Sequence, residues 1–230
     1  MIDDIFYPGV PTAEWQMLLA ERMALTGLLA RLRPRHALEI GTYYGGSLSL
    51  IAQFAERVWA VDIDPEVPNR FRVPPNADLR IGNSEGLVAG MLNELDAAGV
   101  ALNFILIDAD HSANGVRRDI ETVIHRPTPL REPCFILMHD SGNPECRRGI
   151  ATADWASCSY VHHVELDFVP GQIIEHAVQD NRSEVWGGLA MAYLSPQPRQ
   201  HPLVISCSSA TSVAALHRCA ADLSLLGQTI

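Results

Sequence analysis

The chain has 230 residues, enough for a continuous core, and we expect a single domain spanning residues 1–230. Its 17 Lys and Arg against 27 Asp and Glu give a formal net charge of -10, which argues against a basic surface for a phosphate backbone and predicts no nucleic-acid partner. Five cysteines without a CxxC pair, no basic and apolar leader, and no apolar run near the roughly 18 residues of a membrane span predict an unprocessed protein of the reducing cytoplasm.

The first predicted element is an amphipathic helix over residues 12–32, where apolar side chains recur mostly at spacings of three and four. Thr12 can cap this helix, and Pro34 ends it. Short apolar runs then predict strands of a buried parallel sheet at residues 36–41, 57–64, 77–82, 102–110 and 133–140. Helices are expected between them at residues 46–55, 85–98 and 114–125. The prolines in residues 64–76 instead predict a loop with at most one turn of helix.

The pattern changes after Pro144. Residues 161–168 and 185–195 predict two strands joined by a long connection, which form an antiparallel edge of the sheet. The tail, residues 196–230, adds a short apolar run and a final helix from about Ser209. We therefore expect an α/β fold with a Rossmann-like, mostly parallel sheet of seven strands, an antiparallel edge hairpin and helices on both faces. Ligands are expected at the carboxyl ends of the strands.

A glycine-rich turn, GTYYGGS, joins the first predicted strand to the helix that follows. Gly41, Gly45 and Gly46 either let a ligand approach the N–H groups of the helix N-terminus or simply make a tight turn. Asp62 ends the second strand, where a carboxylate can accept hydrogen bonds from both hydroxyls of a ribose. A nicotinamide dinucleotide is disfavoured, because Tyr43 stands where the G-x-G-x-x-G fingerprint has its second glycine.

Five stretches in this order resemble one family: LEIGTYYGGS, VWAVDID, LRIGNS, ILIDADHS and ILMHDS. They are similar to the class I S-adenosylmethionine-dependent methyltransferases, especially the small O-methyltransferase branch that includes macrolide-sugar and cephalosporin-pathway enzymes. The resemblance covers about residues 15–140. It implies S-adenosylmethionine as cofactor.

The resemblance also implies roles for individual residues. It places Glu39, the glycines and Ser47 around the methionine part and Asp62 on the ribose, and it places the turn after the third strand beside adenine. The implied cofactor-binding set is Glu39, Gly41, Thr42, Tyr43, Gly45, Ser47, Asp62, Asn83, Ser84 and Asp108. Two features depart from the family: Asn83 stands where an acid is frequent, and prolines replace most of the helix after the second strand.

Polar side chains follow the fourth and fifth predicted strands. IDADHS places Asp108 and His111 at one strand end, and LMHDS places His139 and Asp140 at the next. Such groups can bind a divalent cation that lowers the pKa of a substrate hydroxyl. The resemblance implies that Asp108 and Asp140 hold magnesium, and His139 replaces the first member of the family's acidic pair. An imidazole ligand shifts the preference toward manganese or iron.

Each of these assignments has an alternative. Asp108 can serve as a helix cap, and His139 can pack or orient instead of binding an ion. Consecutive residues of a strand point in opposite directions, so His139 and Asp140 bind one ion only if the chain turns sharply there, which HDSGNP permits. His111 matches a histidine that acts as base in some of the resembling sugar methyltransferases, so His111 and Asp108 form the predicted catalytic pair. The alternative for His111 is a loop histidine bonded to backbone.

The leading hypothesis is a metal-assisted methyltransferase acting on a hydroxyl of a small polar molecule, either a sugar or another natural product. Two alternatives stay open: a non-catalytic scaffold that binds an adenosyl ligand, and a nicotinamide-dependent oxidoreductase. The expected partners are a hydroxylated small-molecule acceptor and a second copy of the chain in a homo-oligomer, with no membrane.

Overall fold

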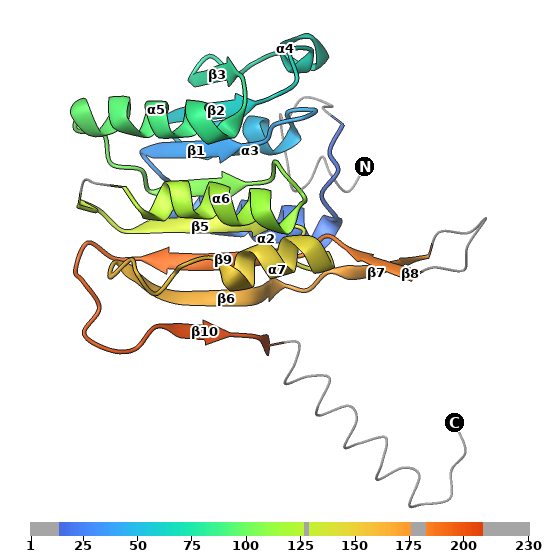
Figure 1. The fold of residues 1–230 in the computed structure, drawn as a ribbon. Coiled ribbons are helices and arrows are strands. Elements are labelled where there is room, and N and C mark those ends of the chain that lie inside the picture. The colour runs from blue at the N-terminus through green and yellow to red at the C-terminus, as the bar shows by residue number, and fades with distance from the viewer. Residues whose placement is uncertain (1–13, 127–128, 176–182, 209–230) are drawn as a thin grey trace, which may run out of the picture.

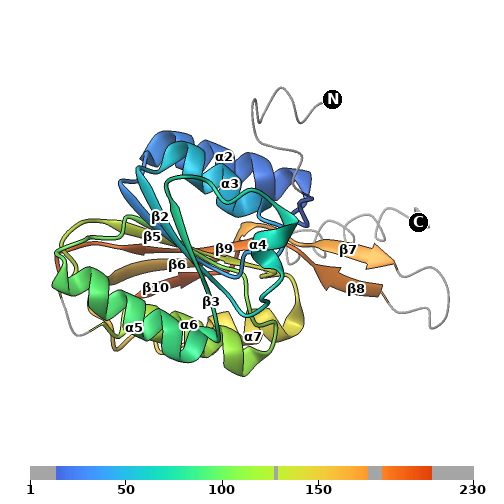
Figure 2. The same cartoon turned by 90° about the horizontal axis from the view of Figure 1, so that it is seen from above.

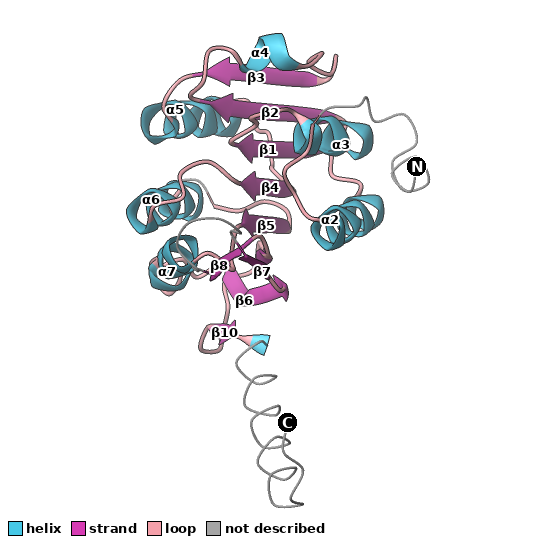
Figure 3. Cartoon of the chain, turned by 90° about the vertical axis from the view of Figure 1, so that its right-hand side faces the viewer, coloured by secondary structure: helices cyan, strands magenta, loops and turns pink. Residues whose placement is uncertain are grey.

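An eight-stranded sheet forms the centre of the molecule. A computed structural model describes residues 14–126, 129–175 and 183–208. The strands of this sheet are β1 His36–Ile40, β2 Arg57–Asp62, β3 Ala77–Ile81, β4 Phe104–Ile107, β5 Cys134–His139, β6 Val161–Val169, β9 Leu189–Leu194 and β10 Val204–Ser206. Their order is β10-β6-β9-β5-β4-β1-β2-β3, which Figure 3 shows as a stack with β3 at one end and β10 at the other.

The predicted α/β class with a mostly parallel sheet is confirmed. Within the described part of the chain, β9 is the one strand that runs antiparallel to both of its neighbours, β5 and β6. The expected number of seven strands was wrong by one, because β10 adds a parallel strand beside β6, with Val204 opposite His163. This strand is only three residues long, so its sequence pattern is too short to predict it.

Helices cover both faces of the sheet. Their bounds are α2 Leu19–Leu32, α3 Gly46–Phe54, α4 Val67–Arg70, α5 Ser84–Ala97, α6 Ala113–Ile124 and α7 Pro144–Thr152. In Figure 2, α2 and α3 lie on one face, and α5, α6 and α7 lie on the other. The residues of β1 alternate between these layers, since Ala37 packs in the core beneath α2 and α3 whereas Leu38 and Ile40 pack in the core on the opposite face.

The first helix begins later than its periodicity indicates. Residues 14–18 are not helical, and the chain is extended at Leu18, the residue before α2. The guanidinium of Arg22 donates to the backbone carbonyls of Trp15, at 2.6 Å, and Met17, at 2.7 Å, which keeps this segment folded back along the helix. Thr12 and the final helix expected from Ser209 lie outside the described residues.

The carboxyl ends of β1, β2, β4 and β5 meet at one edge of the sheet, because these strands are parallel neighbours. A second sheet, made of β7 Gln172–Glu175 and β8 Ser183–Trp186, projects from the same edge (Figure 1). Among the described residues, no helix has both the length and the apolar character needed to cross a membrane.

Candidate active site

The glycine turn packs too closely for any larger residue at two positions. Gly41 has a φ of +92°, and a Cβ there would lie 2.0 Å from the carbonyl oxygen of Asp108. Gly45 has a φ of +79°, and its Cβ would lie 2.5 Å from the ring of Phe71. Both glycines are therefore needed by the protein's own packing. The turn also brings the backbone of β1 directly against the end of β4.

Asp62 ties the glycine turn to the end of β2. Its Oδ2 accepts hydrogen bonds from the backbone N–H groups of Thr42, at 2.7 Å, and Tyr43, at 2.9 Å, and its Oδ1 accepts one from Asp64, at 2.8 Å. An ionised carboxylate has about four acceptor positions, so these three bonds leave room for a further donor. The next side chain, Ile63, is 70% exposed and offers an apolar surface beside this carboxylate.

Glu39 is a buried carboxyl group beneath the turn. The hydroxyl of Thr42 donates to its Oε2 at 2.7 Å, whereas Oε1 has no hydrogen-bond partner among the described residues. Burial raises the pKa of Glu39 to about 8, so the group is largely protonated at neutral pH. A cationic ligand in contact with it would favour the charged form.

A hollow of about 340 Å³ opens at this turn. Its wall combines the turn with the segment before α2 and the end of β4, and the lining residues are Glu14, Trp15, Gln16, Met17, Gly41, Thr42, Tyr43, Tyr44, Gly46, Ser47 and Asp108. Trp15 packs directly on Gly46, where a Cβ would lie 2.6 Å from the indole. The segment before α2 thus covers one side of the hollow.

The side chains of Asn83 and Ser84 are engaged within the protein. Asn83 caps α5 by accepting from the N–H of Glu85 at 3.0 Å, and Ser84 donates to Asp119 at 2.8 Å. Their turn nevertheless follows Ile81, which lies opposite Asp62 in the sheet. These two residues are therefore near Asp62 in space.

The four side chains at the ends of β4 and β5 come together as one cluster. Nδ1 of His139 lies 3.1 Å from Oδ1 of Asp108 and 3.4 Å from Oδ2 of Asp140. Asp140 has a φ of +55°, so the chain leaves the extended conformation directly after His139. This is the sharp turn that the sequence permitted, and it lets two consecutive residues face one point.

His111 completes the cluster on its more exposed side. Its Nε2 lies 3.2 Å from Oδ2 of Asp140 and 3.7 Å from Oδ1 of Asp108. The nearby carboxylate of Asp108 raises the pKa of His111 above its usual value. The ring of Trp186, at the end of β8, stands edge to face with that of His111, with their centroids 5.8 Å apart.

The charges of the cluster reinforce one another. Burial disfavours a charged imidazole, yet the carboxylate of Asp108 holds the pKa of His139 well above its usual value. Burial likewise opposes ionisation of Asp108, but the positive charge of His139 lowers the pKa of Asp108 to about 2. Without another cation, an imidazolium therefore neutralises these carboxylates.

The donor set also fits a divalent cation. One ligand atom from each of Asp108, His139 and Asp140 lies within 4.8 Å of the others. Ligands bound to one ion at about 2.1 Å and at right angles are about 3 Å apart, close to the separations between His139 and the two carboxylates. Two carboxylate oxygens and one imidazole nitrogen are a donor set suited to manganese or iron as well as magnesium.

Three residues near these groups were missed in the sequence. Glu21 of α2 is fully buried, and its Oε2 lies 3.2 Å from Nε2 of His139. Trp186 contacts the ring of His111, and Ile63 follows Asp62 at the end of β2. A charged residue within the apolar stripe of Leu18, Leu25 and Leu29 was the available signal for Glu21. No comparable pattern marks Trp186.

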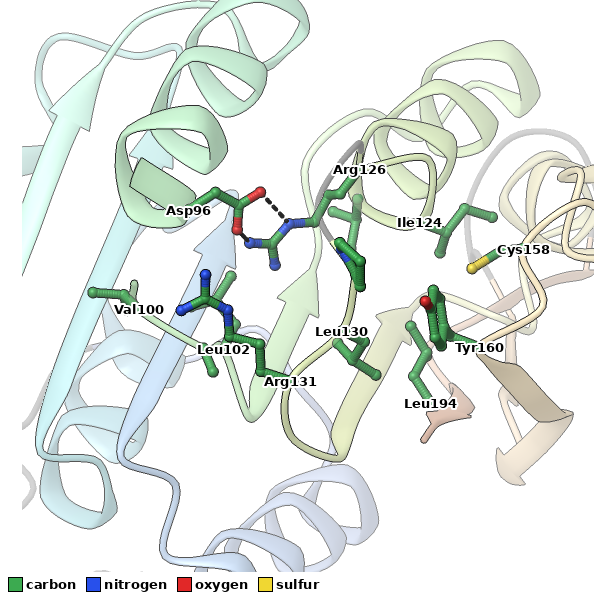
Figure 4. A pocket seen from close by; sticks show the side chains of 13 residues that line it. Asp96, Val100, Leu102, Ile124, Arg126, Leu130, Arg131, Cys158, Tyr160 and Leu194 are labelled. Atoms are coloured by element: carbon green, nitrogen blue, oxygen red, sulfur yellow. Dashed lines mark hydrogen bonds and ion pairs between the residues drawn. The ribbon is translucent and has the colours of Figure 1, made fainter. Parts of the chain in front are cut away.

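A second hollow, whose lining residues are drawn in Figure 4, lies among the loops before β4 and β5. It is walled mainly by apolar side chains such as Leu102, Leu130 and Tyr160. Its principal charged pair, Arg126 with Asp96, is already joined by hydrogen bonds. The hollow is remote from the titratable cluster, and its chemistry does not suggest catalysis.

Comparison with known proteins shows what this site is similar to. Residues 38–141 match a family model described as a methyltransferase domain. This segment of the chain is similar to a methyltransferase domain. The matched segment runs from β1 to the turn after β5 and includes every predicted site residue from Glu39 to Asp140. The prediction of a methyltransferase is confirmed, whereas Glu21 and Trp186 lie outside the matched segment.

Solved structures share the fold of this chain. An O-methyltransferase from Bacillus cereus, in complex with SAH, has 15% sequence identity and a TM-score of 0.53, and the match covers 82% of this chain and 86% of that one. The cofactor-bound protein Rv0187 from MTB has 18% identity and a TM-score of 0.52, with 85% and 86% covered. At such low sequence identity, these structural matches show a shared fold and no more. A search of curated proteins found no match to this sequence.

Proposed function

We propose that this methyltransferase transfers the methyl group of S-adenosylmethionine to a hydroxyl oxygen of a small polar molecule, assisted by a divalent cation. The observation that carries the proposal is the contact between two groups of residues. Asp108 lines the hollow at the glycine turn and also belongs to the carboxylate and imidazole cluster. A methyl donor in the hollow would therefore lie beside the groups that activate an acceptor.

The cofactor is held by the residues around the turn. Asp62 accepts from a ribose hydroxyl at its remaining acceptor position, while Ile63 and the turn at Asn83 flank the adenine. Glu39 lies below the methionine part, where a positively charged ligand stabilises its ionised form. Several of these contacts use backbone groups, which suits the positive φ angles of this turn.

The acceptor binds at the exposed side of the cluster, next to His111. A divalent cation held by Asp108, His139 and Asp140 would lower the pKa of the acceptor hydroxyl. The imidazole of His111, whose Nε2 faces Asp140, takes the hydroxyl proton on its other ring nitrogen as the oxygen bonds to the methyl carbon and the carbon–sulfur bond breaks. Trp186 provides a flat wall next to this base, consistent with a sugar or aromatic ring as acceptor.

Product analysis tests this function. Purified enzyme is incubated with S-adenosylmethionine, Mn²⁺ and a panel of hydroxylated sugars and phenols, and S-adenosylhomocysteine and methylated acceptor are measured by mass spectrometry. The proposal predicts both products in equal amounts for one class of acceptor. Tight binding of the cofactor without either product would favour the non-catalytic scaffold, and preferential binding of NAD would favour the oxidoreductase.

A further inference from the structure

Glu21 is a buried carboxylate that contacts the cluster of Asp108, His139 and Asp140. It belongs to the first turn of α2, outside the matched methyltransferase domain, yet its side chain is only 1% exposed and reaches a residue 118 positions later. A buried carboxylate is costly unless hydrogen bonds and charge compensate for the lost water. Its partners therefore indicate what the group does.

Three donors converge on the Glu21 carboxylate. Oε2 accepts from the N–H of Leu18 at 2.5 Å and lies 3.2 Å from Nε2 of His139. Oε1 accepts from the N–H of Gly188. Gly187 leaves space for this approach, since a Cβ there would lie 2.5 Å from Oε1. Two backbone N–H groups thus fix the carboxylate of Glu21, and the third donor is the imidazole of His139.

The two nitrogens of His139 face different surroundings. Nε2 points to Glu21, whereas Nδ1 points to Asp108 and Asp140. A histidine that binds a metal through one nitrogen usually donates the other N–H to a carboxylate or carbonyl, which fixes its tautomer and the orientation of its ring. The arrangement around His139 has that form.

We propose that Glu21 is a positioning residue that accepts the Nε2–H of His139 and so keeps Nδ1 directed at a cation shared with Asp108 and Asp140. This inference rests on the metal-assisted function proposed above. It assigns to the N-terminal helix a direct part in building the cation site. The same carboxylate binds Gly188, so it also ties this site to the segment that carries Trp186.

The variant Glu21→Gln tests the proposal. Glutamine has one acceptor oxygen in place of two, so it cannot serve all three donors, although it keeps the ability to cap α2. We expect Mn²⁺ affinity, measured by calorimetry and electron paramagnetic resonance, to fall roughly ten- to hundredfold. Affinity for S-adenosylmethionine should stay within about twofold, because Glu21 does not line the hollow. Glu56→Gln, the same change at an exposed position, is the matched control and should leave Mn²⁺ affinity unchanged.

A double-mutant cycle separates positioning from a general structural role. If Glu21 acts through His139, Glu21→Gln should not weaken Mn²⁺ binding further in a His139→Ala background. An equal loss in both backgrounds would overturn the proposal, as would unchanged Mn²⁺ affinity in Glu21→Gln. A wild-type protein that binds no Mn²⁺ would instead remove the metal from the proposed function, and the positioning role with it.

A measurement on the wild-type protein keeps the proposal testable if the variants fail to fold. Nuclear magnetic resonance of ¹⁵N-labelled histidines in the Zn²⁺-loaded protein reports which nitrogen of His139 carries hydrogen. We expect a hydrogen-bonded Nε2–H and a metal-bound Nδ1. A proton on Nδ1 with Nε2 free would overturn the proposal.

Discussion

Nδ1 of His139 lies 3.1 Å from Oδ1 of Asp108, although the two residues are 31 positions apart and end different strands. The parallel pairing of β4 with β5 creates this contact, because it brings Ile107 opposite Met138, one residue before each side chain. The contact joins the imidazole and a carboxylate into one charged group at the edge of the hollow. The chemistry proposed for the chain depends on it.

His111→Ala should reduce turnover by about a hundredfold or more, because it removes the base next to the acceptor. The affinity for S-adenosylmethionine should change little, since His111 is not part of the hollow at the glycine turn. Steady-state kinetics and calorimetry measure the two effects. His125→Ala removes an exposed histidine bonded to Ser157 and serves as the control. Wild-type turnover in His111→Ala would return His111 to a structural role.

Asp62→Ala should weaken S-adenosylmethionine binding by about 1.5 to 3 kcal/mol, the range for hydrogen bonds to a charged group. The structure adds a second effect. The same carboxylate holds the N–H groups of Thr42 and Tyr43, so the variant should also unfold at lower denaturant concentration. Asp64→Asn changes a more exposed carboxylate two residues away and should leave cofactor affinity nearly intact. Equal cofactor affinity in Asp62→Ala and wild type would contradict the ribose assignment.

Cofactor binding should release protons near pH 7. Burial raises the pKa of Glu39 from 4.5 to about 8. In the free protein the carboxyl group of Glu39 therefore stays protonated over most of the pH range between these two values. A cationic ligand lowers the pKa again, and the proton leaves at pH values between the two. Calorimetry in buffers of different ionisation enthalpy measures the release. It should vanish in Glu39→Gln, and an unchanged release in that variant would show that another group supplies the proton.

Gly41→Ala should be strongly destabilising and should also abolish cofactor binding. The φ of +92° disfavours any Cβ, and the new atom would lie 2.0 Å from the carbonyl oxygen of Asp108. Gly90→Ala is the matched control, because Gly90 lies within α5 and a Cβ added there would have no neighbour within 4 Å. That control should gain up to about 1 kcal/mol of stability. Denaturant unfolding of both variants provides the comparison, and similar stabilities would contradict the tight packing at the turn.

The sequence predicted the strands that carry the site better than the geometry within it. The apolar runs before Asp62, Asp108 and His139 are buried strands, as expected. The contact of His139 with Asp140 depended on one backbone angle, the φ of +55° at Asp140, which residue types permit but do not require.

Glu21 and Trp186 show what local patterns omit. Both reach the cluster from elements distant in sequence, so no spacing rule links them to it. The helix periodicity marked α2 as amphipathic but assigned a charged residue no role on its buried face. Tertiary packing decided both placements.

Turnover of the metal-stripped and reloaded enzyme tests the central claim most directly. The protein is treated with a chelator, dialysed and assayed for S-adenosylhomocysteine formation on its acceptor, before and after Mn²⁺, Fe²⁺ or Mg²⁺ is added. We predict that turnover is lost with the metal and restored on reloading, with manganese or iron more effective than magnesium because of the His139 imidazole. Full turnover by protein that contains no metal would contradict the account and leave His111 and the positioning of the substrates to carry the reaction.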